Sequence, residues 1–253
     1  MYKESFLMAW ASLIANKMRS ILTMLGIIIG VAAVIALVSI GNGVKQDIQN
    51  SISSLGSNLL MVMPGAPRTP GVRPSAGSMK SLKVSDYEAI SKLDGVKAAS
   101  PMTNGSYVVI YQNKNWTTSV SGVSYNYLDV NNWSMKSGRF LSEKNVQNRE
   151  RVAVVGKTVV KNLFGDENPV GAEIRVKNIP FRIIGVLNSK GSGAMDNDQD
   201  DMVVIPYTTA MERVEGIDYL RMIYVVGKDE NGIDRLQSDI ENLLRVRHGI
   251  KDT

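Results

Sequence analysis

The sequence contains no cysteine and a single histidine, His248, among its 253 residues. The absence of cysteine excludes disulfides, thiolate catalysis and cysteine-based zinc sites. A lone histidine cannot form a metal cluster or a cysteine–histidine catalytic pair. The pattern Gly-x-Ser-x-Gly, which carries the nucleophile of many hydrolases, is also absent. We therefore expect no catalytic residues, no cofactor and no metal, and we predict that the chain is not an enzyme.

The charge composition is too weak to indicate a nucleic-acid partner. The chain has 29 basic and 24 acidic residues, a formal net charge of +5 at pH 7, and 6% aromatic residues. Nucleic-acid surfaces concentrate basic residues on one face with aromatic side chains between them, and no segment has that pattern. We predict no nucleic-acid binding.

A long uncharged segment dominates the N-terminal part of the chain. No charged residue lies between Ser20 and Val44, and Ile21–Ile40 is almost wholly apolar. At 1.5 Å per residue, about 20–25 helical residues span roughly 30–37 Å, enough for the core of a bilayer. Backbone groups in lipid must bond to one another, so the segment must be helical there. We predict a transmembrane helix over residues 20–44, in contact with membrane lipid.

Two other interpretations of this segment fit less well. A cleavable signal peptide has a shorter apolar region and a small-residue cleavage site, whereas here about twenty residues precede a longer run. A helix buried in a soluble core usually keeps a polar face, and this segment has none.

Basic residues near the segment predict its orientation. Lys3, Lys17, Arg19 and the amino terminus precede it, and positively charged flanks usually stay in the cytoplasm. We therefore predict an inner- or plasma-membrane protein with a cytoplasmic N-terminus. The residues beyond Lys45 would then form an extracytoplasmic domain.

Residues 1–19 have a pattern of their own. Apolar residues recur there at spacings of three and four, and a tryptophan suits the depth of the lipid headgroups. We predict an amphipathic helix on the cytoplasmic membrane face rather than a disordered leader. Its apolar positions are Phe6, Leu7, Trp10, Leu13, Ile14 and Met18.

Two features of the long helix are candidates for packing against another helix. Gly26 and Gly30 form a Gly-x-x-x-Gly motif, which lets a neighbouring helix approach closely, although such motifs also arise by chance in apolar runs. An apolar stripe then continues past the membrane, so we predict a stalk over residues 45–56, ended by Gly56. The stripe packs either on its own domain or on a second stalk. Its residues are Val44, Ile48, Ile52 and Leu55.

Short strand patterns mixed with a few helical ones follow, which indicates an α+β architecture. The clearest amphipathic helix lies in Asn231–Arg247. We expect a shorter helix over Asp86–Leu93, with Ser85 as its cap and Glu88 completing a capping box. The expected strands are Asn58–Met63, Ser106–Tyr111, Thr117–Gly122, Arg151–Val155, Glu173–Lys177, Phe181–Leu187, Met202–Ile205 and Tyr219–Val226, with further helices at Lys157–Phe164 and Pro206–Arg213.

The triplet Gly156-Lys157-Thr158 is like the end of a phosphate-binding P-loop. That loop needs a glycine five residues before Gly156, where this chain has Arg151. Without that glycine the backbone amides cannot wrap a phosphate, and at most a weak anion site at the helix end remains. We therefore do not expect nucleotide binding here.

Two loops are candidates for partner contacts. Pro64–Ser81 is rich in proline, glycine and serine and should be exposed. Asp196–Asp201 begins like a calcium-binding EF-hand loop but has Asp201 where glycine is required and Tyr207 where glutamate is required. We expect a solvated acidic loop, with a weak cation site as the lesser alternative. His248 lies at the C-terminal end of a helix, where a positive charge is favoured.

The segment Asn16–Ile35, with sequence NKMRSILTMLGIIIGVAAVI, resembles the start of the MacB/FtsX-like permeases of ABC transporters. Later segments look like that family's periplasmic core domain, so the resemblance covers essentially the whole chain. One runs from Val154-Val155-Gly156 to Leu163-Phe164-Gly165. The others are Pro169-Val170-Gly171, Phe181–Val186 and Val204–Tyr207.

The resemblance implies a domain of two lobes. One is a discontinuous α/β lobe of residues 57–102 and 216–250, and the other is a mostly-β lobe inserted at 103–215. It also implies a homodimer that works with a cytoplasmic ABC ATP-binding subunit and a membrane-fusion or adaptor protein. Such permeases transmit ATP-driven motion through the stalk, for export of antibiotics, peptides or lipids.

The family has three further membrane helices after this domain, whereas no later segment here reaches half a membrane span. We therefore expect a fragment cut before the second span or a truncated relative. The rival interpretation is a single-span surface receptor or binding module, whose isolated domain would bind its ligand alone. An anchored enzyme ranks third because the sequence contains no recognisable active site.

Overall fold

The computed structural model describes residues 3–4, 8, 17–55, 58–65, 80–192, 198–229 and 232–250. The chain divides into two compact units, residues 1–50 and 51–253, and each is described by itself. The predicted amphipathic helix and the loop Pro64–Ser81 lie mostly outside the described residues.

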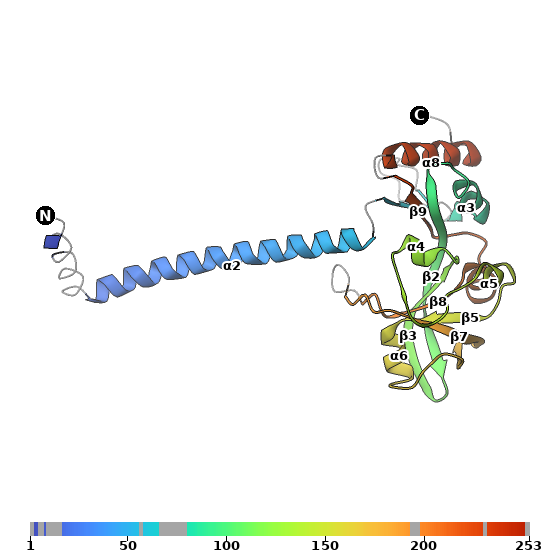
Figure 1. The fold of residues 1–253 in the computed structure, drawn as a ribbon, viewed down its shortest axis with the longest axis horizontal. Coiled ribbons are helices and arrows are strands. Elements are labelled where there is room, and N and C mark those ends of the chain that lie inside the picture. The colour runs from blue at the N-terminus through green and yellow to red at the C-terminus, as the bar shows by residue number, and fades with distance from the viewer. Residues whose placement is uncertain are drawn as a thin grey trace. The chain divides into compact units, whose positions relative to one another are not determined.

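Helix α2 runs without a break over Lys17–Leu55, a length of 39 residues (Figure 1). The segment predicted to span the membrane and nearly all of the predicted stalk are therefore helical. The candidate span Lys17–Gly41 has a mean hydropathy of 2.9, and none of its most apolar part is buried. The Thr23 hydroxyl donates to the Arg19 carbonyl at 3.0 Å, which satisfies this polar group within the helix. A helix that is apolar on all sides requires lipid or another chain to cover it.

The second unit is built on one nine-stranded sheet with the order β1-β9-β2-β3-β8-β5-β7-β4, in which β6 pairs with β2 and β7. Most neighbours are antiparallel, while β3 and β8, and β5 and β7, run parallel. The α+β class is thus confirmed. The strands are β1 (Leu59–Val62), β2 (Val96–Tyr111), β3 (Lys114–Val123), β4 (Met135–Gly138), β5 (Val152–Val155), β6 (Glu173–Val176), β7 (Ile179–Leu187), β8 (Met202–Pro206) and β9 (Met222–Gly227).

Short helices join these strands, and one longer helix ends the unit. Every strand and helix predicted beyond the long N-terminal helix is present, with shifted ends. The helices α4 and α5 were not predicted because four or five residues make little more than one helical turn and show no periodicity. Strand β4 was not predicted because its sequence, MKSG, lacks the apolar run that marks the equally short β5. The helices are α3 (Val84–Ile90), α4 (Tyr127–Val130), α5 (Glu143–Gln147), α6 (Lys157–Leu163), α7 (Tyr207–Thr209), the π-helix η3 (Ala210–Glu215) and α8 (Ile233–His248).

Strand β2 connects the two ends of the sheet. Its first half pairs with β9, from Val96 opposite Gly227 to Met102 opposite Met222. From Met102 onward it pairs with β3, as far as Tyr111 opposite Lys114. The predicted strand therefore begins ten residues earlier than expected. The boundary predicted between residues 102 and 103 falls where β2 changes partner, and the division into lobes stays a prediction.

Apolar side chains gather in three buried clusters along the sheet. One lies under α3 and α8 and includes Ile90, Leu220 and Ile223. A second surrounds Phe181, which is fully buried beside α6 and β6. The third lies beneath α4 and includes Tyr127. The sheet is thus covered by helices at several points rather than by one layer.

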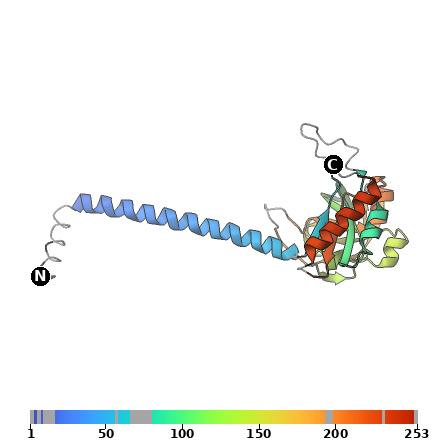
Figure 2. The same cartoon turned by 90° about the horizontal axis from the view of Figure 1, so that it is seen from above.

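Helix α8, the red helix near the C-terminus in Figure 2, belongs to the second unit. It packs through the stripe that its sequence predicts. Leu236 and Ile240 are buried, with 3% and 4% of their surfaces exposed. The other three positions of the stripe pack partly buried against the same cluster as α3, and they are Ile233, Leu243 and Leu244.

The predicted cap of α3 is wrong. The helix begins at Val84, and Lys83 precedes it in an extended conformation. Asp86 closes this end, because its carboxylate accepts the backbone N–H of Lys83 at 2.9 Å. Ser85 therefore lies inside the first turn, and Glu88 is not the residue that completes the cap.

The helix predicted over Pro206–Arg213 changes geometry within its length. Three α-helical residues pass into the π-helix η3, which Gly216 ends in the left-handed conformation at φ 67°. Glycine adopts this conformation without steric cost. The Lys177 amine donates to the Val214 carbonyl at 3.0 Å and satisfies an end carbonyl that the helix leaves free.

The packing of α8 predicts a large effect for one substitution. Leu236→Ala leaves a cavity between α8 and the sheet, and we expect it to lower the free energy of unfolding by about 2–5 kcal/mol. Gln237→Ala, on the exposed side of the same turn, should change it by less than about 0.5 kcal/mol. Urea denaturation of the two variants, followed by tryptophan fluorescence, measures both values, and equal losses would contradict this packing.

Candidate functional site

The residues predicted to pack against other helices all lie in α2. Apart from adjacent residues and the helix's own backbone, no described atom lies within 4 Å of the position that a Cβ would take at Gly26 or Gly30. Their apolar neighbours are exposed, for example Ile27 with 67% of its surface accessible. These glycines therefore leave an open face on the helix, and their use in packing stays a prediction. The stalk residues Val44, Ile48, Ile52 and Leu55 are helical, while their side chains lie outside what the structure describes.

The triplet that resembles a P-loop is a structural turn. Gly156 ends β5 and precedes α6, and its N–H donates to the Met202 carbonyl at 2.9 Å. The Thr158 N–H donates to the Asp200 carbonyl at 3.3 Å. The Thr158 hydroxyl donates to the Asp198 carboxylate at 2.6 Å. Groups that would face a phosphate in a P-loop are therefore already bonded to the chain itself.

The acidic loop, as far as it is described, folds back on the protein. Asp200 is buried with 4% of its surface exposed. Its carboxylate accepts the Ser189 hydroxyl and the N–H groups of Lys190 and Gly191, at 2.8 and 3.2 Å for the two amides. The Asp201 carboxylate accepts the indole N–H of Trp116 at 2.8 Å. The prediction of a solvated loop is thus wrong for Asp200. Its carboxylate is held inside the domain because the hydroxyl and amide donors there need a hydrogen-bond acceptor.

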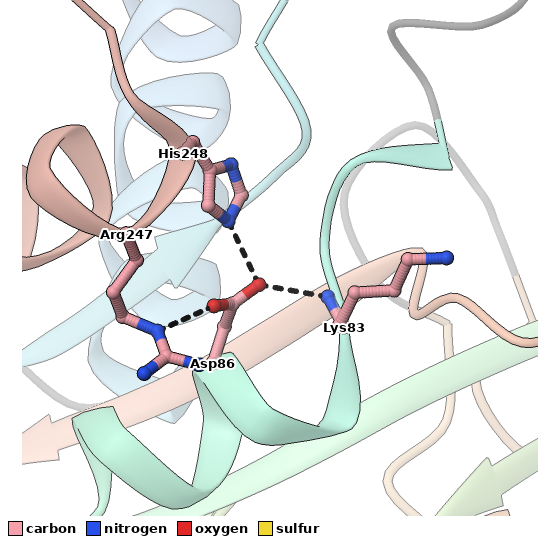
Figure 3. Close-up of polar contacts among 4 residues, drawn as sticks. All are labelled: Lys83, Asp86, Arg247 and His248. Carbon is pink, nitrogen blue, oxygen red and sulfur yellow. Dashed lines mark hydrogen bonds and ion pairs between the residues drawn. The ribbon is translucent and has the colours of Figure 1, made fainter.

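A polar cluster joins the start of α3 to the end of α8 (Figure 3). Asp86 is 2% exposed and accepts from three donors. Arg247 donates from Nε at 2.8 Å, His248 from Nε2 at 2.9 Å, and the Lys83 backbone N–H at 2.9 Å. His248 thus has a specific partner, which the general preference of helix ends for positive charge did not identify.

These bonds control the ionisation of Asp86. Burial raises its pKa, but the hydrogen bonds from Arg247, the Lys83 N–H and His248 lower it by more. The pKa of Asp86 therefore lies below its ordinary value of 3.8. The side chains of Arg247 and His248 keep 33% and 22% of their surface exposed, so the charges are only partly removed from water.

The described contacts of His248 differ from those of a histidine in a hydrolytic triad. A histidine and a carboxylate are two members of a hydrolytic triad, but the third must be a nucleophile bonded to the histidine. Among the described contacts of His248, none is to a hydroxyl group. The described residues also contain no group of three or more acidic or histidine side chains able to hold a metal ion. The cluster instead fastens two segments that lie 161 residues apart in the sequence.

Comparison with known proteins gives a consistent result. Residues 20–243 match the family described as the MacB-like periplasmic core domain. The chain is 44% identical over 253 residues to a Rhodospirillum rubrum protein named "Macrolide export ATP-binding/permease protein MacB", covering 99% of this chain and 38% of that protein. A protein of the same name from Azoarcus sp. is 41% identical over 244 residues, with coverages of 96% and 37%. The chain thus spans well under half the length of these curated relatives.

Solved structures agree with the fold described above. The periplasmic region of MacB from Actinobacillus actinomycetemcomitans superposes with a TM-score of 0.66 and 27% identity, covering 79% of this chain and 89% of that one. The extracellular domain of the ABC-type transporter YknZ from Gram-positive bacteria gives 0.64, with 18% identity and coverages of 77% and 96%. At 18% identity, the similarity to YknZ supports the fold alone.

The Asp86 cluster predicts how stability depends on pH. A carboxyl whose folded-state pKa is depressed stabilises the fold above its unfolded-state pKa, and this contribution is lost as pH falls through the folded-state value. Stability should therefore decrease as pH drops below about 4. We expect Asp86→Asn to lower the free energy of unfolding at pH 7 by about 1–3 kcal/mol and to weaken this acid-induced loss.

Urea denaturation at a series of pH values measures both effects. The matched control is Asp94→Asn, which removes an exposed carboxylate paired with Lys228 and should leave the pH profile unchanged. A profile that is the same for Asp86→Asn and the unsubstituted chain would show that the cluster does not carry this dependence.

Proposed function

Because the chain belongs to the MacB-like periplasmic core domain family, we propose that it is the membrane and extracytoplasmic part of an ABC-type export permease. The observation that carries this proposal is the continuity of α2. A single helix contains the apolar segment and ends at Leu55, four residues before β1 begins the folded domain. The apolar segment and nearly all of the stalk are thus one helix, which we propose as the element that carries motion toward the domain.

In this proposal the chain does no covalent chemistry. The energy comes from ATP hydrolysis by a cytoplasmic ABC ATP-binding subunit. The names of the relatives combine ATP-binding and permease functions, and the present chain corresponds to part of their length. The N-terminus lies in the cytoplasm and the domain on the opposite side, as the basic leader favours. Cargo would be antibiotics of the macrolide class named for the relatives, or peptides or lipids.

Two copies of the chain are proposed to act together with an adaptor protein of the membrane-fusion type. Gly26 and Gly30 would let the membrane helices of the two copies approach, since both are open on the isolated helix. The stalk stripe would carry motion between them. The loop Pro64–Ser81 remains a candidate contact for the adaptor, whereas Asp200 and Asp201 are already bonded within the domain.

The absence of cysteine makes the proposed orientation directly testable. Each of Lys3→Cys and Asp94→Cys introduces a single exposed thiol. A membrane-impermeant maleimide should label Asp94→Cys in intact spheroplasts and Lys3→Cys only after the membrane is opened. The unsubstituted chain is the blank. The opposite labelling pattern would refute the orientation.

The stalk is testable by placing charge on its apolar stripe. Ile48→Asp with Ile52→Asp should reduce macrolide efflux and stimulated ATPase activity in cells with the complete transporter by about tenfold or more, because a packed interface does not accept unpaired carboxylates. Gln49→Asp with Asn50→Asp adds the same charge on the other faces and should leave both activities close to normal. If both activities persist in the first variant at equal membrane abundance, the stalk is not the coupling element.

A further inference from the structure

The domain contains an open cleft of about 900 Å³ next to the strands β5 and β7. Basic side chains dominate its charged lining. It is lined by four arginines, against the two carboxylates of Glu150 and Glu173. The arginines are Arg139, Arg149, Arg151 and Arg182.

Three of these arginines come from neighbouring strands, so the sheet fixes their positions. Arg151 directly precedes β5, Arg182 lies in β7, and Arg139 directly follows β4. The sheet order places β5, β7 and β4 side by side. The Arg182 N–H donates to the Arg151 carbonyl at 2.9 Å, and the Arg139 N–H donates to the Ile184 carbonyl at 2.9 Å. A binding surface built on strands is held more rigidly than one built on loops.

The fourth lining arginine differs from these three in its ion pairing. Arg149 pairs with Glu212 at 2.9 Å. In the described part of the chain, the side chains of Arg139, Arg151 and Arg182 form no ion pair, and all three are exposed.

The two lining carboxylates offset only part of this charge. Glu150 accepts the side-chain amide of Asn145 at 2.6 Å. Glu173 lies opposite Arg182 in the strand register, and no ion pair joins them within the described residues. With four arginines against two carboxylates, the lining keeps an excess of positive charge.

The chemistry of the cleft favours a carboxylate-bearing chain. A planar guanidinium binds a carboxylate through two parallel hydrogen bonds, which a lysine cannot do. The lining also includes three buried apolar residues, Val152, Ile183 and Ile184. A volume near the upper end of the usual range of roughly 300–1,000 Å³ for ligand sites admits several peptide residues rather than one small ion. A bilayer surface is flat and cannot enter a concave cleft.

The neighbouring sheet edge favours an extended peptide. Strand β4 ends the sheet, and among the described strands it pairs with β7 alone. A free strand edge presents backbone groups to which an extended segment can add. The last residue of β4, Gly138, also lines the cleft.

We propose that this arginine cleft binds an acidic, extended segment of a partner protein. The cleft is thus a surface for recognition between proteins. This role goes beyond the transport function proposed above and does not depend on it. Arg139, Arg151 and Arg182, which form no ion pair among the described residues, supply charge specificity, and the apolar lining residues and the β4 edge hold the backbone of the segment.

A labelled hexaglutamate peptide tests the proposal with the whole chain in neutral detergent. We expect fluorescence anisotropy to show saturable binding that weakens with salt, with at least tenfold weaker binding of hexaglutamine. The combination Arg139→Gln, Arg151→Gln and Arg182→Gln should weaken hexaglutamate binding at least tenfold. Arg235→Gln, at an exposed position of α8 outside the cleft, should leave it unchanged.

Several outcomes would overturn the proposal. Equal binding of the two peptides, or unchanged binding by the triple variant, would remove the cleft as an acidic-segment site. Full competition by millimolar inorganic phosphate would indicate a site for small anions instead. Displacement of the peptide by phosphatidylglycerol vesicles, but not by phosphatidylcholine vesicles, would assign the arginines to lipid headgroups. Circular dichroism of the triple variant confirms that a loss of binding is not a loss of fold.

Discussion

The folded domain depends on one continuous strand. β2 is 16 residues long and forms hydrogen bonds with β9 along its first half and with β3 along its second. Near its end it also meets β6. The apolar cluster under α3 and α8 and the cluster around Phe181 are therefore parts of one sheet. A slip of one residue in the register of a half-buried strand turns every side chain to the wrong face. The register of β2 therefore fixes the positions of β9 and β3 at the same time.

Local sequence patterns predicted the elements well. The stripe in α8 and the apolar runs of β5, β7 and β8 are strong signals, because burial on one or both faces requires them. The long apolar helix is equally clear from composition. The early start of β2 at Val96 was less visible in the sequence. Ala98, Ala99, Ser100 and Pro101 interrupt the alternation of large apolar residues that indicates a strand.

Contacts between distant residues could not be read from the sequence. Nothing in the pattern around Asp86 indicates that Arg247 and His248 lie beside it, because the pairing arises only when α3 and α8 meet on the sheet. The same is true of the arginine cleft, in which Arg182 lies in β7 while Arg151 and Arg139 adjoin the neighbouring strands β5 and β4. The triplet at Gly156 and the acidic loop were each doubtful as binding motifs. The structure shows that they bond to each other through Thr158 and Asp198.

The short strand β1 ties the start of the folded domain to a late part of the chain. Four residues of β1 pair with β9, from Leu59 opposite Val226 to Val62 opposite Ile223. Asn58 adds a side-chain bond to the Gly227 carbonyl at 2.6 Å, across 169 residues of sequence. Strand β9 in turn pairs with β2. The opening residues of the domain are therefore anchored in the sheet, and they cannot come loose without breaking the ladder that also holds β9 in place.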